Sequence, residues 1–362
     1  MNENWPIDVS HKMRVLSFAA FLGVMFIHSS VPLYTPGCAW WNLAFASFLC
    51  KHLVCWAVPF FFFASGFWFG KGQYLRGEES YGSLLRRKSK TLLIPYLLWS
   101  IIGAIIGVPL ILINNHIQHQ PMLSRTFLDG TGVLDCVGKL LGLTCFLPMH
   151  CGVLWFVKLL LLVFVIAFVW RVFVRNVLMV CVLFILASIA VLSPSLKIPY
   201  LGLGTNTLGF FSLGVVAAQM NWLSQRVSRW LFIVSTILWI SISILMGGTD
   251  ASGIPAPEWL LRLLPILGIV GMIGLYDNCK WLNSLMLRPW ALETFWLYCS
   301  HQIIASWVIA ILLFVFGKGD LVAFVLMFVT PILVIPISLS LSALVKRFCR
   351  PLHNRLTGER TK

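Results

Sequence analysis

Charged residues are scarce in this chain: Asp, Glu, Lys and Arg make up 11% of its 362 residues, whereas soluble domains carry about a quarter. Acidic residues are especially few, at 12 against 27 basic ones. The sequence is 59% hydrophobic, with a mean hydropathy of +0.90. No aqueous core could bury so much apolar sequence, but a lipid bilayer can solvate it. The composition therefore excludes a soluble protein and indicates an integral membrane protein.

The short motifs of soluble enzymes are also missing. The sequence has no glycine-rich phosphate loop, no GxSxG elbow and no HExxH pair. Its ten cysteines include no CxxC pair and none at zinc-ligand spacing with His, so no metal or bound cofactor is expected. Cys136, Cys145 and Cys151 fall in one expected external segment, where a single disulfide is an open alternative.

The net charge of +15 raises the alternative of a nucleic-acid partner. The basic residues do not form one face, however. They fall in short clusters between apolar runs, which is typical of cytoplasmic loops of membrane proteins. We therefore expect membrane lipids, and no nucleic acid, as partners.

Apolar runs of about 17–25 residues, the length that spans a bilayer, recur from one end of the chain to the other. They predict an all-α fold, a polytopic bundle of about ten transmembrane helices. No polar stretch separates them, so residues 1–362 are expected to form a single domain. The predicted spans are 14–33, 52–70, 91–113, 152–172, 176–194, 207–221, 229–246, 258–277, 290–314 and 321–345.

Lys and Arg are concentrated in alternate connections, with the richest groups at 71–90 and 346–362. The positive-inside rule places these connections and both termini in the cytoplasm, which suits a multi-pass protein of the cell (inner) membrane. The first span is expected to be retained, because no small-x-small cleavage site follows it. The longest external connection is expected at 114–151.

Ionisable residues within membrane spans are costly and therefore mark candidate functional sites. His28 lies fourteen residues after Arg14, about 21 Å along a helix. A neutral imidazole at that depth could take a proton from a hydroxyl and return it to a leaving group. The alternative is an interfacial His that only bonds a neighbouring helix. The candidates are His28, Lys158, Arg262, Glu293 and His301.

A polar stripe runs along one late span. Tyr298 and His301 are spaced i, i+3 and share a helix face, and Glu293 precedes them near the same face. The stripe either takes part in function or only forms hydrogen bonds between helices. Lys158 and Arg262 lie near predicted span ends, where long basic side chains commonly snorkel to the headgroups, although either could attract an anionic sugar or phosphate.

Basic residues also cluster just before the third predicted span, at Arg86, Arg87, Lys88 and Lys90. The cluster is dense enough to hold a phosphorylated ligand from the cytosol. Positive-inside topology explains it equally well.

Five short motifs, in order along nearly the whole chain, resemble those of the acyltransferase-3 family of membrane O-acyltransferases. The first resembles the family's first helix with its essential histidine, here His28, and the last resembles its Ser-Phe-x-x-Tyr-x-x-His motif. Many members carry an Arg eleven positions before the histidine; here that position is Ser17, and Arg14 lies one turn earlier. Thr294 replaces the usual Ser of the last motif. The motifs are 14–18 with 26–29, 59–67, 92–99, 154–158 and 293–301.

The resemblance implies an enzyme that transfers an acyl group, usually acetyl, from cytosolic acyl-CoA to a hydroxyl of a cell-surface glycan or lipid-linked sugar. In the corresponding hypothesis His28 is the general base, and His301 and Tyr298 orient it or the acceptor hydroxyl. The expected substrate-binding residues are Ser65, Trp155, Lys158 and Glu293. The residues expected to attract the CoA phosphates are Arg14, Arg86, Arg87 and Lys88.

Two other functions fit the same polar residues. A transporter or flippase for a glycan or lipid precursor would line its path with such a stripe. Pro331 and Pro336 interrupt the tenth span as in broken helices, but no internal repeat accompanies them. A non-catalytic scaffold would not need so many ionisable residues within its spans.

Overall fold

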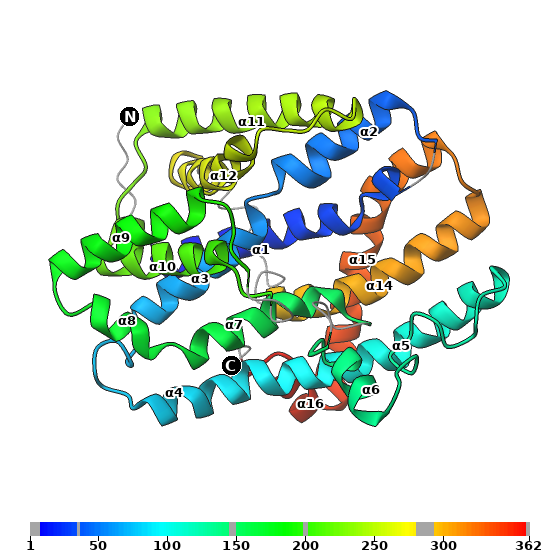
Figure 1. Cartoon of the computed structure of the whole chain (residues 1–362), viewed down its shortest axis with the longest axis horizontal. Coiled ribbons are helices and arrows are strands. Elements are labelled where there is room, and N and C mark those ends of the chain that lie inside the picture. The colour runs from blue at the N-terminus through cyan, green and yellow to red at the C-terminus, as the bar shows by residue number, and fades with distance from the viewer. Residues whose placement is uncertain (1–7, 35–36, 145–149, 198–201, 280–292, 360–362) are drawn as a thin grey trace.

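The computed structural model describes residues 8–34, 37–144, 150–197, 202–279 and 293–359 (Figure 1). These residues form helices joined by loops, and no β-strand occurs among them. The all-α prediction is confirmed. The described residues form about ten helical regions, and each of the ten predicted spans overlaps one of them.

The helices that correspond to predicted spans vary in length. Seven regions are long and apolar enough to cross a membrane, whereas α7, α9 and α10 are shorter. The chain is thus a multi-pass membrane protein. The regions are α1 (Val9–His28), α2 (Trp40–Ser47) continuing through η2 (Phe48–Leu53) to α3 (Ala57–Gly70), α4 (Tyr81–Lys88) continuing through η3 (Ser89–Leu93) to α5 (Ile94–Ile117), α7 (Trp155–Val165) with α8 (Phe168–Phe173), α9 (Val177–Leu192), α10 (Thr205–Gln219), α11 (Arg229–Ala251), α12 (Glu258–Asn278), α14 (Thr294–Phe316) and α15 (Asp320–Phe348).

The limits of several predicted spans differ in the structure: α1 covers Val9–His28 instead of 14–33, and the third helical region begins at Tyr81 instead of 91. The second span begins at Trp40, because α2, the π-helix η2 and α3 form one apolar stretch of 31 residues. The fourth is interrupted after Val165. The hydroxyl of Tyr81 donates to the Val165 carbonyl, so this oxygen has a partner outside its own helix at the point where α7 ends.

Helix α1 lies in the middle of the bundle (Figure 1) and contacts α3, α12, α14 and α15. Its N-terminal part is joined to α12 by a buried ion pair in which Lys12 Nζ lies 2.8 Å from Asp277 Oδ1. Next to it, His11 Nδ1 and the Tyr276 hydroxyl are 2.7 Å apart. Polar contacts therefore fix the end of α1 opposite to His28.

Helices α3 and α10 pack backbone to backbone. A Cβ atom on Gly66 would lie 1.9 Å from the carbonyl oxygen of Phe211, and one on Gly214 would lie 2.0 Å from that of Phe63. Only glycine permits this approach, as in small-residue interfaces of other membrane helices. Two neighbouring residues of the second motif (59–67) thus have separate roles. Gly66 packs against α10, and Ser65 faces another side of α3.

The connection after α5 folds back along that helix. It contains α6 (Val133–Leu140), and the next residues contact the beginning of α5 and of α7. The Tyr96 hydroxyl donates to the Leu141 carbonyl, and Lys158 Nζ donates to the Gly142 carbonyl at 2.9 Å. The connection therefore reaches far from the end of α5 at Ile117 and packs between two helices of the bundle.

Candidate active site

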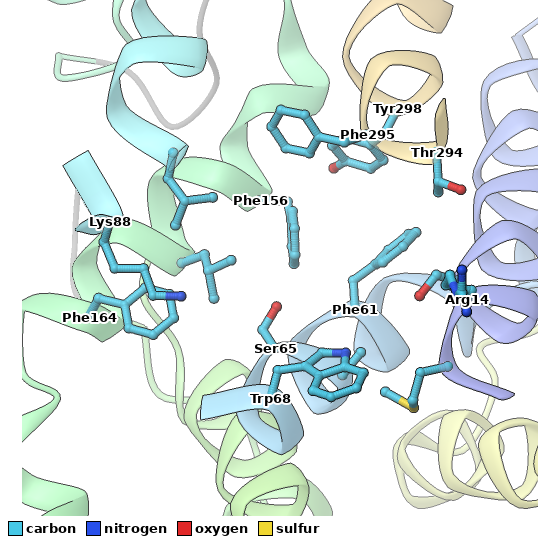
Figure 2. Close-up of a pocket in the computed structure, with 15 residues that line it drawn as sticks. Arg14, Phe61, Ser65, Trp68, Lys88, Phe156, Phe164, Thr294, Phe295 and Tyr298 are labelled. Atoms are coloured by element: carbon cyan, nitrogen blue, oxygen red, sulfur yellow. The ribbon is translucent and has the colours of Figure 1, made fainter. Parts of the chain in front are cut away.

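A cavity of about 380 Å³ lies between α1, α3, η3, α7 and α14 (Figure 2). Most of its wall is apolar and aromatic. Phe61 and Trp68 come from α3, Phe156 and Phe164 from α7, and Phe295 from α14. An aromatic wall of this kind fits an extended, largely apolar ligand.

Two cationic side chains line this aromatic cavity. Figure 2 shows Arg14 and Lys88 on opposite sides of it, with Ser65 between them. Lys88 Nζ lies 3.9 Å from the centre of the Phe164 ring, a cation–π contact that holds the ammonium group against the wall. The cavity can therefore take a ligand that combines an anionic group with an apolar arm.

Four of the predicted site residues line this cavity: Arg14, Ser65, Lys88 and Tyr298. Ser17, at the position where many family members carry Arg, lines it as well. Arg86 is exposed. Arg87 binds Glu79 instead, with its Nη2 2.7 Å from Glu79 Oε2, and these hydrogen bonds lower the pKa of Glu79.

A histidine pair lies at the other end of α1. The rings of His28, the last residue of α1, and His301 of α14 have centroids 5.1 Å apart. The structure thus brings together the two histidines that the sequence separates by 273 positions, by subtraction of their numbers. In the described part of the chain neither of them lines the cavity.

The hydrogen bonds of His301 determine its tautomer. Its Nδ1 lies 2.7 Å from the carbonyl oxygen of Tyr298 and 3.2 Å from that of Leu297. Carbonyl oxygens only accept, so in the neutral ring Nδ1 carries the hydrogen and Nε2 carries the lone pair. His301 is fully buried, and Nε2 has no hydrogen-bond partner within the described residues. A buried imidazole with a free lone pair can accept a proton or a hydrogen bond from a reacting group.

Tyr298 connects the cavity to the histidine pair. Its ring lines the cavity and packs against Phe61 and Phe156, with centroids at 5.5 and 5.6 Å. Its hydroxyl donates to the Val153 carbonyl at 2.8 Å. One turn later on α14, Gln302 Oε1 accepts from the Val153 N–H, also at 2.8 Å. These two bonds hold Val153, the residue immediately before the fourth motif (154–158), against α14.

The remaining predicted residues face other parts of the molecule. Trp155 packs against Phe62 at a centroid distance of 6.3 Å, and Lys158 binds the Gly142 carbonyl. Glu293 accepts from the Ser342 hydroxyl at 3.1 Å. Arg262 pairs with Glu258. None of these side chains lines the cavity among the described residues.

The sequence interpretation missed the aromatic side chains that form the cavity wall. Phe61 and Phe156 are inside two of the family-like motifs, and the density of aromatic residues there was the available signal. Cys136 and Cys151 are free thiols, so a disulfide between them is absent, and Cys145 lies outside the described residues. Within the described ranges, no group of three or more His, Cys, Asp or Glu side chains could hold a metal ion.

Comparison with known families agrees with the motif resemblance. The family model described as an acyltransferase domain matches residues 13–345, nearly the whole chain. The chain belongs to the acyltransferase-3 family. It is a membrane acyltransferase that transfers groups other than amino-acyl groups, as predicted. No curated protein and no solved structure matches the chain.

Proposed function

We propose that this acyltransferase transfers an acyl group, with acetyl as the expected group, from cytosolic acyl-CoA to a hydroxyl of a cell-surface glycan or lipid-linked sugar. The protein would lie in the cell (inner) membrane with both termini in the cytoplasm. The observation that carries the proposal is the position of Tyr298, which lines the cavity and accepts the hydrogen bond of His301 beside His28.

The separation of the two parts suits a donor and an acceptor that approach from different sides. Arg14 is near the beginning of α1 and His28 is at its end, about 21 Å apart along the helix axis. Arg14 and Lys88 would attract the phosphates of CoA, and the aromatic wall would hold its pantetheine arm. Acyl-CoA is thus a substrate, and no bound cofactor takes part.

The histidine pair would supply the proton transfers. The His28 imidazole takes the proton from the acceptor hydroxyl while that oxygen attacks the thioester carbonyl carbon. Collapse of the tetrahedral intermediate breaks the C–S bond, and the His28 imidazolium returns the proton to the departing sulfur of CoA. The products are an ester and free CoA. The lone pair on His301 Nε2 stabilises the imidazolium by accepting a hydrogen bond.

The alternative of a transporter or flippase predicts no such chemistry. In its favour, Pro331 and Pro336 are inside the long helix α15. The family assignment favours the enzyme, because a transporter does not need the acyl donor. The two alternatives differ in whether CoA is released.

The test uses protein purified in nanodiscs with radiolabelled acetyl-CoA and measures free CoA and label on glycan. His28→Ala should lower turnover by about 10²–10⁴-fold, the usual effect of losing a general base. His116→Ala, at an exposed histidine in the last turn of α5, is the matched control and should behave like the wild type. Unchanged turnover in folded His28→Ala would contradict the role of His28. Absence of both CoA binding and turnover in the wild type would favour the transporter.

A further inference from the structure

The C-terminal end of the described chain packs against the bundle. We call residues 350–359, which comprise α16 (Arg350–Leu356) and the turn after it, the C-terminal strap. It begins beyond residue 345, where the family match ends. It contacts α5 and α15, and Figure 1 shows α16 beside the lower end of α15. The strap therefore lies outside the residues that the family model matches.

One anchor of the strap is His353, whose side chain is fully buried. Its Nε2 lies 2.9 Å from the Ser342 hydroxyl of α15 and 3.4 Å from Glu293 Oε2. Burial lowers the pKa of His353, although the nearby Glu293 carboxylate opposes this shift. The neutral imidazole can thus donate to Ser342, which in turn donates to Glu293 at 3.1 Å. This chain of hydrogen bonds links the strap to the residue immediately before α14.

Aromatic stacking strengthens the same anchor. The His353 ring stacks on Trp296 of α14 with a centroid distance of 5.4 Å and an interplanar angle of 21°. Trp296 also meets Trp99 of α5 edge-on at 5.1 Å. The strap therefore contacts a continuous group of rings that joins α5 to α14.

A second anchor holds the end of the strap on α5 and η3. The indole Nε1 of Trp99 donates to the Leu356 carbonyl at 3.1 Å. Gly358 has a φ of +64°, and a Cβ on it would lie 2.4 Å from the Thr91 carbonyl oxygen. Both the backbone conformation and the lack of space require glycine at this position.

The two anchors lie directly beside the cavity wall. Glu293 is followed by Thr294 and Phe295, and Thr91 is followed by Leu92. Thr294, Phe295 and Leu92 all line the cavity. The strap thus fixes the two segments, the beginning of α14 and η3, that form one side of the proposed donor site.

We propose that the C-terminal strap positions this side of the cavity, with His353 as the positioning residue, and that it thereby sets the affinity for the acyl donor. The proposal rests on the proposed function in naming the donor. It does not place His353 in contact with the reacting atoms. Loss of the anchor should therefore weaken donor binding and leave the chemical step largely unchanged.

The first experiment compares His353→Ala, His353→Gln and Leu352→Ala in nanodiscs. His353→Ala should raise the KM for acetyl-CoA and the Kd for CoA by about three- to tenfold, the effect of losing one net hydrogen bond, with kcat within about twofold. His353→Gln, which keeps a donor, should recover part of the affinity. Leu352→Ala, at an exposed position on the same helix, should match the wild type. Wild-type KM and Kd in folded His353→Ala, or a loss confined to kcat, would overturn the proposal.

A second experiment does not depend on acyl-CoA. Ser65→Cys places a thiol in the cavity, and its maleimide labelling is followed by mass spectrometry of the corresponding peptide. A second substitution is then added to Ser65→Cys. Gly358→Ala should release the strap and accelerate labelling. Trp99→Phe, which takes the place of His353→Ala if that variant does not fold, should have the same effect. An unchanged rate in both would contradict the positioning role. If the wild type neither binds CoA nor turns over acetyl-CoA while labelling accelerates, the donor assignment fails and the strap's role in the cavity stands.

Discussion

His301 Nδ1 donates its hydrogen to the carbonyl oxygen of Tyr298 at 2.7 Å, within one turn of α14. This bond leaves the lone pair on Nε2, which is buried and has no partner among the described residues. The first prediction tests the roles of the two ring nitrogens of His301 separately. His301→Asn can retain the donor near the Nδ1 position but lacks Nε2, so it should lose activity by about 10–10²-fold, the effect of losing one hydrogen bond to a charged group, as should His301→Ala. Near-normal acetyl-CoA turnover in His301→Asn would show that only the bond to Tyr298 matters.

The second prediction concerns the length of the acyl group. The rings of Phe61, Phe156 and Tyr298 pack against one another where α3, α7 and α14 line the cavity. Phe61→Ala should open space and shift turnover from acetyl-CoA towards butyryl-CoA by about tenfold or more, because a methylene group changes pocket discrimination by roughly 10–200-fold. Trp68→Ala, at a half-exposed cavity residue, is the control. An unchanged ratio of the two rates in Phe61→Ala would mean that the aromatic group does not contact the acyl chain.

The third prediction tests the close approach of α3 and α10. Gly66→Ala places a Cβ 1.9 Å from the Phe211 carbonyl oxygen, and such overpacking costs about 1–3 kcal/mol or more. The thermal midpoint in detergent should fall, and acyl transfer with it, because Ser65 is the preceding residue. Gly248→Ala in α11, where a Cβ meets nothing within 4 Å, should leave the midpoint unchanged or raise it slightly. Equal midpoints for the two variants would contradict this packing.

The fourth prediction concerns the ion pair between Lys12 and Asp277, whose side chains are almost completely buried. Lys12→Ala leaves Asp277 as a buried, unpaired charge, which should destabilise the protein by about 3–5 kcal/mol. Lys12→Met combined with Asp277→Asn removes both charges and keeps an acceptor for the Val227 N–H, which bonds Asp277 at 3.0 Å. The double variant should therefore be more stable than Lys12→Ala in thermal unfolding. The reverse order would show that the pair does not act as a unit.

The fifth prediction is a pH dependence of the connection after α5. His150 Nε2 accepts from the Phe127 N–H at 3.0 Å, and burial lowers the pKa of His150. The folded state therefore favours the neutral ring. The contribution of the neutral His150 ring to stability is fully present above its unfolded pKa of about 6.5. This contribution is lost as the pH falls through the lower pKa of the folded state. Hydrogen exchange at Phe127, corrected for the intrinsic rate, should increase between about pH 7.5 and 5.5 in the wild type. His150→Gln keeps an acceptor and should lose this dependence; a matching increase in that variant would assign the change to another group.

Much of this protein follows from its sequence, because length and hydropathy are local properties and a bilayer has a fixed thickness. They predicted the all-α class and the helical regions. The motifs predicted the family through residues such as His28 and His301. Even the end of the second span at Gly70 follows from the basic residue after it.

Tertiary structure alone decided which of the predicted polar residues share a site. Arg87, Lys158 and Glu293 each looked available for a ligand in the sequence, yet in the structure they contact Glu79, the Gly142 carbonyl, and Ser342 with His353, respectively. Each partner comes from a different segment, and hydrogen bonds and ion pairs depend on distances of a few ångströms that no linear pattern encodes. The same reason explains why the cavity wall was missed: its six aromatic rings come from three helices and form one surface only after those helices have packed.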